Sequence, residues 1–160
     1  MKRNLMLILF FFSFAILIFQ CAKQVSTEAD IEAIKNIGNL IVKAFNEGNL
    51  DDLMKLYTDN AIVMPPNQPA AIGKEAVRSY YQFVEENSYS IEYPSDEIKV
   101  AGDFAFRRGT FKGTLTLEES GETVSINNKG MLLLQKQTDG SWKISHAVFN
   151  SNTPIENTNY

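Results

Sequence analysis

The sequence predicts an α+β domain, because helical periodicity comes first along the chain and strand periodicity follows it. Apolar residues recur every three or four positions between residues 31 and 57, and again between residues 73 and 87. From Ser88 onward the period is two, and Asp139-Gly140 is a strong hairpin-turn signal. Helices followed by a run of antiparallel hairpins are typical of this class, in which one face of the sheet packs on the helices.

Residues 1–21 are predicted to be a signal peptide. Lys2 and Arg3 precede an uncharged run, Leu5–Phe19, which as a helix would span about 22 Å, short of the roughly 30 Å hydrocarbon core. The run ends at Cys21, the only cysteine, and residues 18–21 resemble the lipobox of bacterial lipoproteins. This resemblance implies lipidation of Cys21 and a membrane anchor in the cell envelope, at the outer membrane. A secreted or periplasmic protein is the alternative.

The composition and motifs of the chain limit which partners and cofactors are expected. The 160 residues suit one domain, with 44% apolar residues for a core. Without Lys2 and Arg3 the chain has 13 basic and 19 acidic side chains, a net charge of −6, which disfavours nucleic acid as a partner. The sequence has a single histidine and no dinucleotide, phosphate-loop or nucleophile-elbow motif, so we expect no cofactor and no metal.

Three helices are expected in a domain spanning residues 29–154, between a tether (22–28) and a flexible tail (155–160). The first begins near the capping pair Thr27 and Asp30 and ends at Gly48. Asn49 caps the second, which is shorter, and the third runs from Gly73 to about residue 87. The expected apolar stripe of the first helix is Ile31, Ile34, Ile37, Ile41 and Phe45.

Six strands are expected, with residues 67–72 as a loop. They are Ala61–Met64, Ser88–Tyr93, Glu97–Val100, Phe104–Leu117, Val124–Gln137 and Trp142–Asn150.

The last strand is predicted to direct a polar pair into the core side of the sheet. Alternate residues of a strand point to opposite faces, so Trp142 and Ile144 would share their face with His146 and Asn150. In the preceding strand, Lys129 would lie at a pocket mouth if Met131 and Leu133 also point inward.

Four segments, in this order, resemble the SnoaL-like branch of the nuclear transport factor 2 and ketosteroid isomerase superfamily. They are YTDNAIVMPPN, GKEAVRSYY, GDFAFRRGTF and DGSWKISHAVFNSNTP, and the resemblance covers Ile31 to Pro154. It implies a cone in which a strongly curved antiparallel sheet wraps around the three helices and leaves a pocket at the wide end. Members of the superfamily include isomerases, dehydratases and domains without catalysis, and many are dimers, so the fold alone does not define an activity.

The chain departs from the pattern of this branch where relatives carry acids. Ala147 and Asn152 stand at positions that are acidic in relatives, which leaves Asp59 and Asp103 as the candidates for a carboxylate base. An isomerase of this type needs such a base in a dry pocket. The missing acids therefore count against an enzyme.

The candidate site residues follow from side-chain chemistry. His146 is the candidate general acid or base, and Arg108 matches the arginine of the family's R-G-T-aromatic pattern. Tyrosine hydroxyls could polarise a carbonyl, and Met64, Pro65 and Pro66 would shape a pocket wall. The predicted ligand-binding residues are Tyr57, Met64, Tyr81, Arg108, Lys129 and Asn150. For each of them, a structural role in the core or at the surface is the alternative.

Three functions compete. The first is a lipid-anchored domain of the cell envelope that binds a small, partly apolar molecule in its pocket. The second is an isomerase or dehydratase that uses His146, with Tyr57 or Asn150 polarising a carbonyl. The third is a dimerising structural or interaction module, motivated by Leu132 and Leu134 if these face outward.

Overall fold

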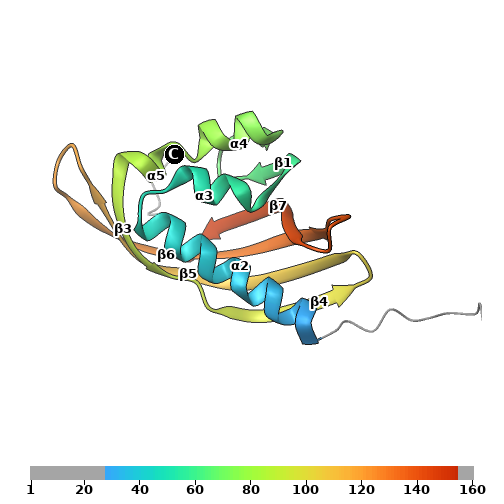
Figure 1. The fold of residues 1–160 in the computed structure, drawn as a ribbon. Coiled ribbons are helices and arrows are strands. Elements are labelled where there is room, and N and C mark those ends of the chain that lie inside the picture. Colours follow the sequence, from blue (N-terminus) through green and yellow to red (C-terminus); the bar gives the residue numbers. More distant parts are fainter. Residues whose placement is uncertain (1–27, 155–160) are drawn as a thin grey trace, which may run out of the picture.

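The computed structural model describes residues 28–154 of the chain, so the predicted signal peptide, Cys21, the tether up to residue 27 and the tail lie outside the described residues (Figure 1). The helices are α2 (Glu28–Asn46), α3 (Leu50–Lys55), α4 (Lys74–Tyr80) and α5 (Phe83–Glu86). The strands are β1 (Tyr57–Met64), β2 (Ala71–Ile72), β3 (Asn87–Glu92), β4 (Ser95–Ala101), β5 (Phe104–Leu117), β6 (Thr123–Lys136) and β7 (Trp142–Ser151).

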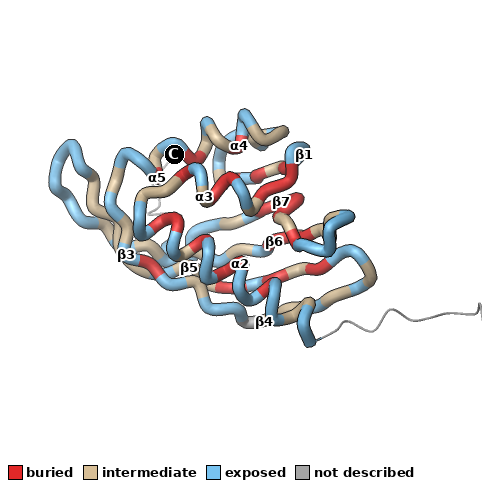
Figure 2. Tube along the Cα trace, in the orientation of Figure 1, coloured by how far each residue is buried: buried red, intermediate tan, exposed pale blue. Residues whose placement is uncertain are grey.

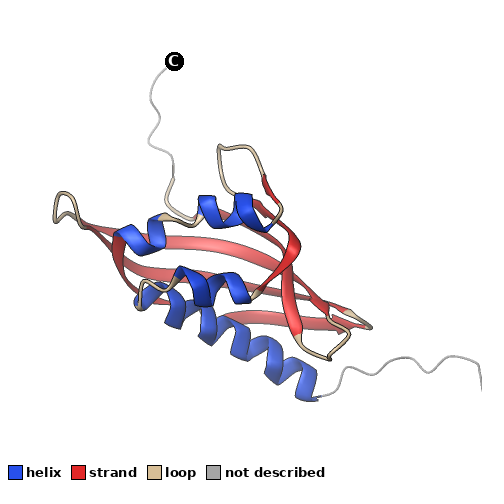
Figure 3. Ribbon diagram, turned by 45° about the horizontal axis from the view of Figure 1, so that its top comes forward, coloured by secondary structure: helices blue, strands red, loops and turns tan. Residues whose placement is uncertain are grey.

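The strands form one strongly curved, unclosed sheet with the helices on its concave side, which confirms the predicted α+β class (Figure 3). The strand order is β2-β1-β7-β6-β5-β3, and β4 pairs with β5 beyond the end of β3. All pairings are antiparallel except β1 with β7. The buried residues form a layer between sheet and helices (Figure 2).

Helix α2 is amphipathic as predicted. Its apolar stripe packs on the sheet, and Ile34, Ile37, Ile41 and Phe45 of this stripe are buried. Gly48, at a φ of 64°, follows the helix and donates its backbone N–H to the Phe45 carbonyl at 3.1 Å, a left-handed conformation that favours glycine. No helix within residues 28–154 has the length and apolar character needed to cross a membrane.

The short elements differ from the prediction at three places. Strand β1 begins at Tyr57, four residues earlier than predicted, because this residue already pairs with Ile144 of β7. Residues 71 and 72, predicted as loop, form β2 against β1. The predicted single helix from Gly73 to residue 87 is divided at Tyr81, where the backbone leaves helical geometry and the tyrosine ring is buried in the core.

A β-bulge in β7 reverses the predicted orientation of the side chains that follow Ser145, whereas Trp142 and Ile144 face the core as predicted. Leu133 of β6 pairs with His146, but Leu134 pairs with Ile144, so Ser145 is an extra residue. As a result Ile144 and Ala147 both point to the helices and are buried, although strict alternation would separate them. The prediction that His146 and Asn150 share the face of Trp142 is therefore wrong.

The orientation predicted for β6 is also reversed. Leu132 and Leu134 are buried against the helices, whereas Met131 is 43% exposed on the opposite face. The unbroken apolar run Met131–Leu134 carries no alternation that would distinguish the two faces.

Candidate functional site

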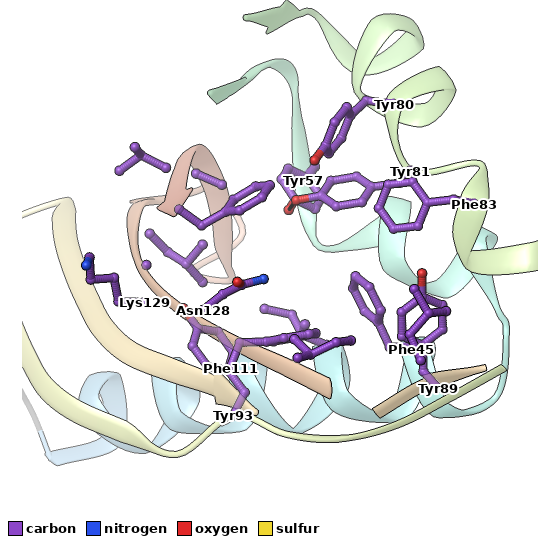
Figure 4. Close-up of a pocket in the computed structure, with 18 residues that line it drawn as sticks. Phe45, Tyr57, Tyr80, Tyr81, Phe83, Tyr89, Tyr93, Phe111, Asn128 and Lys129 are labelled. Atoms are coloured by element: carbon purple, nitrogen blue, oxygen red, sulfur yellow. Dashed lines mark hydrogen bonds between the residues drawn. The ribbon is translucent and has the colours of Figure 1, made fainter. Parts of the chain in front are cut away.

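A cavity of about 270 Å³ opens between the sheet and the C-terminal half of α2, α4 and α5 (Figure 4). Its aromatic lining residues are Phe45, Tyr57, Tyr80, Tyr81, Phe83, Tyr89, Tyr93, Phe111 and Phe149. These residues come from four strands, three helices and two connecting segments, which hold Tyr81 and Tyr93, so the cavity exists only in the folded domain.

Edge-to-face ring contacts hold the aromatic lining together. The Phe45 ring of α2 lies 5.2 Å from the rings of Tyr89 and Phe111 and 6.1 Å from that of Tyr81. Each such pair contributes about 0.5–1.5 kcal/mol beyond area burial. The rings thus form a preformed apolar surface.

Two tyrosines supply polarity deep in this cavity. The Tyr57 hydroxyl donates a hydrogen bond of 2.9 Å to the Tyr81 hydroxyl, and both residues are buried. Removal from water disfavours the phenolate, so burial raises the pKa of Tyr57 and the pKa of Tyr81 well above the usual value. Both groups are therefore neutral at physiological pH, and the pair can offer one O–H to a ligand oxygen.

Two further tyrosines line the same space. Burial raises the pKa of Tyr80, whose hydroxyl points toward the Tyr57–Tyr81 pair in Figure 4. Burial also raises the pKa of Tyr89 to about 12. These groups too are neutral hydrogen-bond donors and acceptors at neutral pH.

Asn128 lines the cavity and was missed by the prediction from sequence. It pairs with Phe111 across the β5–β6 ladder and shares the helix-facing row of β6 with Gly130 and Leu132. Its amide points into the cavity (Figure 4). The long β5–β6 hairpin was the available signal, since its turn sets this register.

The arginine that faces the helices is Arg107, not the predicted Arg108. The Arg107 guanidinium is buried, stacks on the Tyr93 ring at 3.9 Å and donates to the Tyr93 carbonyl. Arg108 lies on the other face, where its Nε is 3.5 Å from a carboxylate oxygen of Glu97. Adjacent strand residues must point in opposite directions, and the pairing of β5 with its neighbours decides which one is buried.

Most of the other predicted site residues lie on the face of the sheet that is turned away from the helices, which we call the outer face. Across the strands, Lys129 pairs with Asn150 and Leu133 with His146 on this face. His146 Nδ1 lies 3.2 Å from Ser145 Oγ. Neither His146 nor Asn150 lines the cavity.

Met64 and Lys129 also project to the outer face. Met64 is 38% exposed and pairs with Val148 on this face, so it forms no wall of the cavity. Lys129 contributes to the lining, but its ammonium group points away from the cavity (Figure 4). Of the predicted ligand-binding residues, Tyr57 and Tyr81 direct their polar groups into it.

Neither of the two candidate carboxylate bases lines the cavity. Asp59 is exposed and lies 3.3 Å from the Lys74 ammonium, and Asp103 is exposed in the turn before β5. Among the described lining residues there is no carboxylate and no imidazole. The cavity can therefore bind an apolar molecule and polarise an oxygen on it, but these lining residues supply no general base.

Comparisons with known proteins agree with this architecture. The family model of the SnoaL-like domain matches residues 40–145. A search of curated proteins finds no significant match. Many solved structures share the fold.

Three of these structures illustrate the similarity. A ketosteroid isomerase-like protein from Erwinia carotovora atroseptica is 25% identical, with a TM-score of 0.72 over 80% of this chain and 100% of its own. A conserved protein from Planctomyces limnophilus is 20% identical, with a TM-score of 0.72 over 81% of this chain and 100% of its own. A nuclear transport factor 2-like superfamily protein from Salmonella enterica is 13% identical, with a TM-score of 0.67 over 81% of this chain and 95% of its own.

The family model covers well over half of the chain, and the curved α+β architecture is the one that the segment pattern predicts. The chain therefore belongs to the SnoaL-like domain family.

Proposed function

We propose that this domain binds a small, neutral ring molecule in the aromatic cavity. The observation that carries the proposal is the buried Tyr57–Tyr81 hydrogen bond inside a mostly aromatic and aliphatic lining. Apolar walls supply most of the affinity, and one placed donor orients a carbonyl oxygen of the ligand. A charged ligand would lose its hydration without gaining a counter-ion from this lining.

The cavity volume indicates the size of the ligand. A cavity of about 150 Å³ holds benzene, and pockets for drug-sized molecules begin near 300 Å³. The observed 270 Å³ lies between these limits. A molecule of about two fused rings fits this range.

An isomerase or dehydratase is the second candidate function. The tyrosine pair could stabilise a developing oxyanion, in the way that preorganised donors do in such enzymes. Proton abstraction also needs a base within about 2.6–3.2 Å of the reacting carbon's proton, directly or through water. His146 projects to the outer face, so it does not supply that base. Binding is therefore the function that the lining supports better.

A direct binding measurement tests the proposal. We expect 2-acetylnaphthalene, a neutral two-ring ketone, to bind with a blue shift of its fluorescence. Ile126→Trp would fill the cavity from its lining and abolish binding, whereas Ser125→Trp, on the exposed opposite face of the same strand, would not. Equal binding by wild type and Ile126→Trp, or no binding by wild type, would overturn the proposal.

The proposed location is the bacterial cell envelope, through a lipid on Cys21. The support is the charged start, the apolar run Leu5–Phe19 and the lipobox-like residues before Cys21. Mass spectrometry of the mature protein tests this directly. A diacylglyceryl mass on Cys21, lost in Cys21→Ser, is expected; an intact N-terminus at Met1 would contradict it.

The proposed oligomer is a homodimer formed through the outer face. Two cross-strand rows on this face are rich in apolar side chains, of which Met64, Ile72, Met131 and Val148 are exposed. A two-fold interface needs only one such patch, because the same surface serves both subunits. Burial of exposed apolar side chains would drive the association. This arrangement keeps the third function, an interaction role, compatible with ligand binding on the other side of the sheet.

A further inference from the structure

Asn128 is a polar group in the cavity that the proposed function has not used. It lies on the helix-facing row of β6, and its neighbours on that row, Ile126 and Gly130, also line the cavity. Its partner across the ladder is Phe111, whose ring contacts Phe45 at 5.2 Å and Tyr93 at 5.6 Å. These neighbours on the row and across the ladder carry no polar side chain.

The hydrogen-bonding capacity of this amide is unused within the domain. Among the described residues, none makes a hydrogen bond to the Asn128 side chain, although the adjacent Asn127 accepts one from Asn152 at 3.0 Å. An asparagine amide carries two N–H donors and one acceptor oxygen. A half-buried amide that points into an apolar cavity without partners favours a ligand that satisfies it.

The Tyr57–Tyr81 pair and the Asn128 amide therefore lie on different elements of the fold. The hydroxyls of Tyr57 and Tyr81 lie next to β1 and α4, and the Asn128 amide projects from β6 toward the aromatic cluster in Figure 4. The rest of the lining is mostly aromatic and aliphatic, and Phe45 and Phe111 are among its rings. A ligand that meets both groups must carry polar atoms at two separate positions on an apolar ring frame.

We infer that the cavity recognises a neutral hydroxy-ketone on a two-ring frame, with the ketone oxygen at the Tyr57–Tyr81 pair and the hydroxyl at the Asn128 amide. This inference rests on the proposed function and adds a specificity-determining residue to it. The tyrosine pair offers a donor, which fits a ketone oxygen. The amide both donates and accepts, which fits a hydroxyl better than an ether or a second ketone.

The cations near the cavity exclude an acid as the preferred ligand. The Lys129 ammonium points to the outer side of the sheet (Figure 4). The Arg107 guanidinium is buried behind the Tyr93 ring, on which it stacks at 3.9 Å. A carboxylate in the cavity would therefore lose its hydration, and no cationic group of the described lining residues points into the cavity to compensate for this loss.

A matched set of naphthalenes tests the inference by fluorescence titration. The four probes are 2-acetyl-6-hydroxynaphthalene, 2-acetylnaphthalene, 2-naphthol and 6-hydroxy-2-naphthoate. Wild type is expected to bind the hydroxy-ketone about fivefold more tightly than the plain ketone, the gain of one ordinary hydrogen bond. The naphthoate is expected to bind at least tenfold more weakly than the hydroxy-ketone.

The variants separate recognition from structure. Asn128→Leu keeps a similar volume and is expected to lose the fivefold preference while it binds 2-acetylnaphthalene within twofold of wild type. Asn127→Leu, the same substitution one residue away on the exposed face, is expected to keep the preference. Tyr81→Phe is expected to weaken both ketones and to leave 2-naphthol unchanged.

The experiment distinguishes failure of the Asn128 role, failure of the proposed ligand class and failure of the binding function. If wild type binds both ketones equally, or if Asn128→Leu weakens both by the same factor, the role of Asn128 is overturned and the binding function stands. Preferred binding of the naphthoate overturns the ligand class. If no probe binds wild type, the proposed function fails, and the inference fails with it.

Discussion

The guanidinium of Arg107 occupies the space that a side chain on Gly38 would need. A Cβ built on Gly38 would lie 2.4 Å from Arg107 Nη2 and 2.8 Å from Cζ, well inside normal contact distance. Gly38 is buried in the middle of α2, where glycine is otherwise unfavourable by about 1 kcal/mol relative to alanine. The close approach of helix α2 to a buried arginine of β5 explains this glycine.

Gly38→Ala is predicted to destabilise the domain by about 1–2 kcal/mol. Overpacking of a core costs about 1–3 kcal/mol, and the better helix propensity of alanine offsets part of this cost. Urea unfolding measures the change. Asn39→Ala, at the exposed neighbouring position, is the control and should be neutral or slightly stabilising. A Gly38→Ala protein as stable as wild type would show that α2 and Arg107 can move apart freely.

The two adjacent arginines are predicted to differ sharply in their contribution to stability. Arg107→Met removes the stacking on Tyr93 and the hydrogen bond to its carbonyl, and should cost about 2–4 kcal/mol. Arg108→Met removes an exposed pair with Glu97 and should change stability by less than about 1 kcal/mol. Thermal unfolding of the two variants gives the comparison. Equal effects would contradict the assigned faces of β5.

Tyr57 and Tyr81 are predicted to be energetically coupled. Tyr57→Phe or Tyr81→Phe alone leaves the partner hydroxyl buried without its hydrogen bond, a cost of about 1–3 kcal/mol. The double variant removes both polar groups, so its cost should be clearly smaller than the sum of the single effects. A double-mutant cycle in urea measures this difference. Additive effects would mean that the hydroxyls do not share a hydrogen bond in solution.

Stability is predicted to fall above about pH 10. Burial raises the pKa of Tyr57, of Tyr81 and of Tyr89, the last to about 12. Unfolded tyrosines lose their protons near pH 10, so above that pH the unfolded state binds fewer protons than the folded state, and the free energy of unfolding decreases as the pH rises. Below pH 10 these groups are protonated in both the folded and the unfolded state, so they do not make the free energy of unfolding depend on pH.

Urea unfolding at pH 8, 9.5 and 11, together with phenolate absorbance, measures this dependence. Tyr57→Phe/Tyr81→Phe should show a shallower decline between pH 9.5 and 11 than wild type. An identical pH profile for the two proteins would argue against burial as the origin of the decline.

Substitutions on the outer face are predicted to affect association and to leave the cavity intact. Met131→Glu places a charge at the centre of the proposed dimer contact and should shift the protein to monomers in sedimentation experiments. His146→Ala should bind 2-acetylnaphthalene within about twofold of wild type, because the imidazole is on the other side of the sheet. Asn39→Glu, on the exposed side of α2, is the control for added charge. Loss of ligand binding in a folded His146→Ala would contradict its placement.

Periodicity in the sequence was sufficient to predict the class of fold and most element boundaries. The long strand β5, residues 104–117, was predicted at its observed ends, and β6 within one residue of them. Turn and cap residues marked the breaks: Gly48 ends α2, and Asn49 Oδ1 accepts from the Asp52 N–H at 2.9 Å to cap α3. These signals are local, so they act in the same way whatever surrounds them.

The direction of side chains on the last two strands could not be predicted in this way. Strict alternation assigns His146 to the face of Ile144, but Ser145 forms a bulge and its hydroxyl donates to the Leu133 carbonyl at 3.1 Å. One added residue exchanges the two faces for every residue that follows. All candidate site residues taken from that strand moved to the outer face for this reason.

By itself, the sequence determined the α+β class, the order of its elements, the family resemblance and the presence of tyrosines that could donate hydrogen bonds. The tertiary structure decided which face of each strand is buried, that Arg107 rather than Arg108 packs against Gly38, and that Asn128 joins the tyrosine pair in one cavity. The physical reason is the distance along the chain over which the deciding interactions act. Propensity and periodicity arise between residues close in the chain, whereas strand register, bulges and cavities arise from contacts between segments far apart in it.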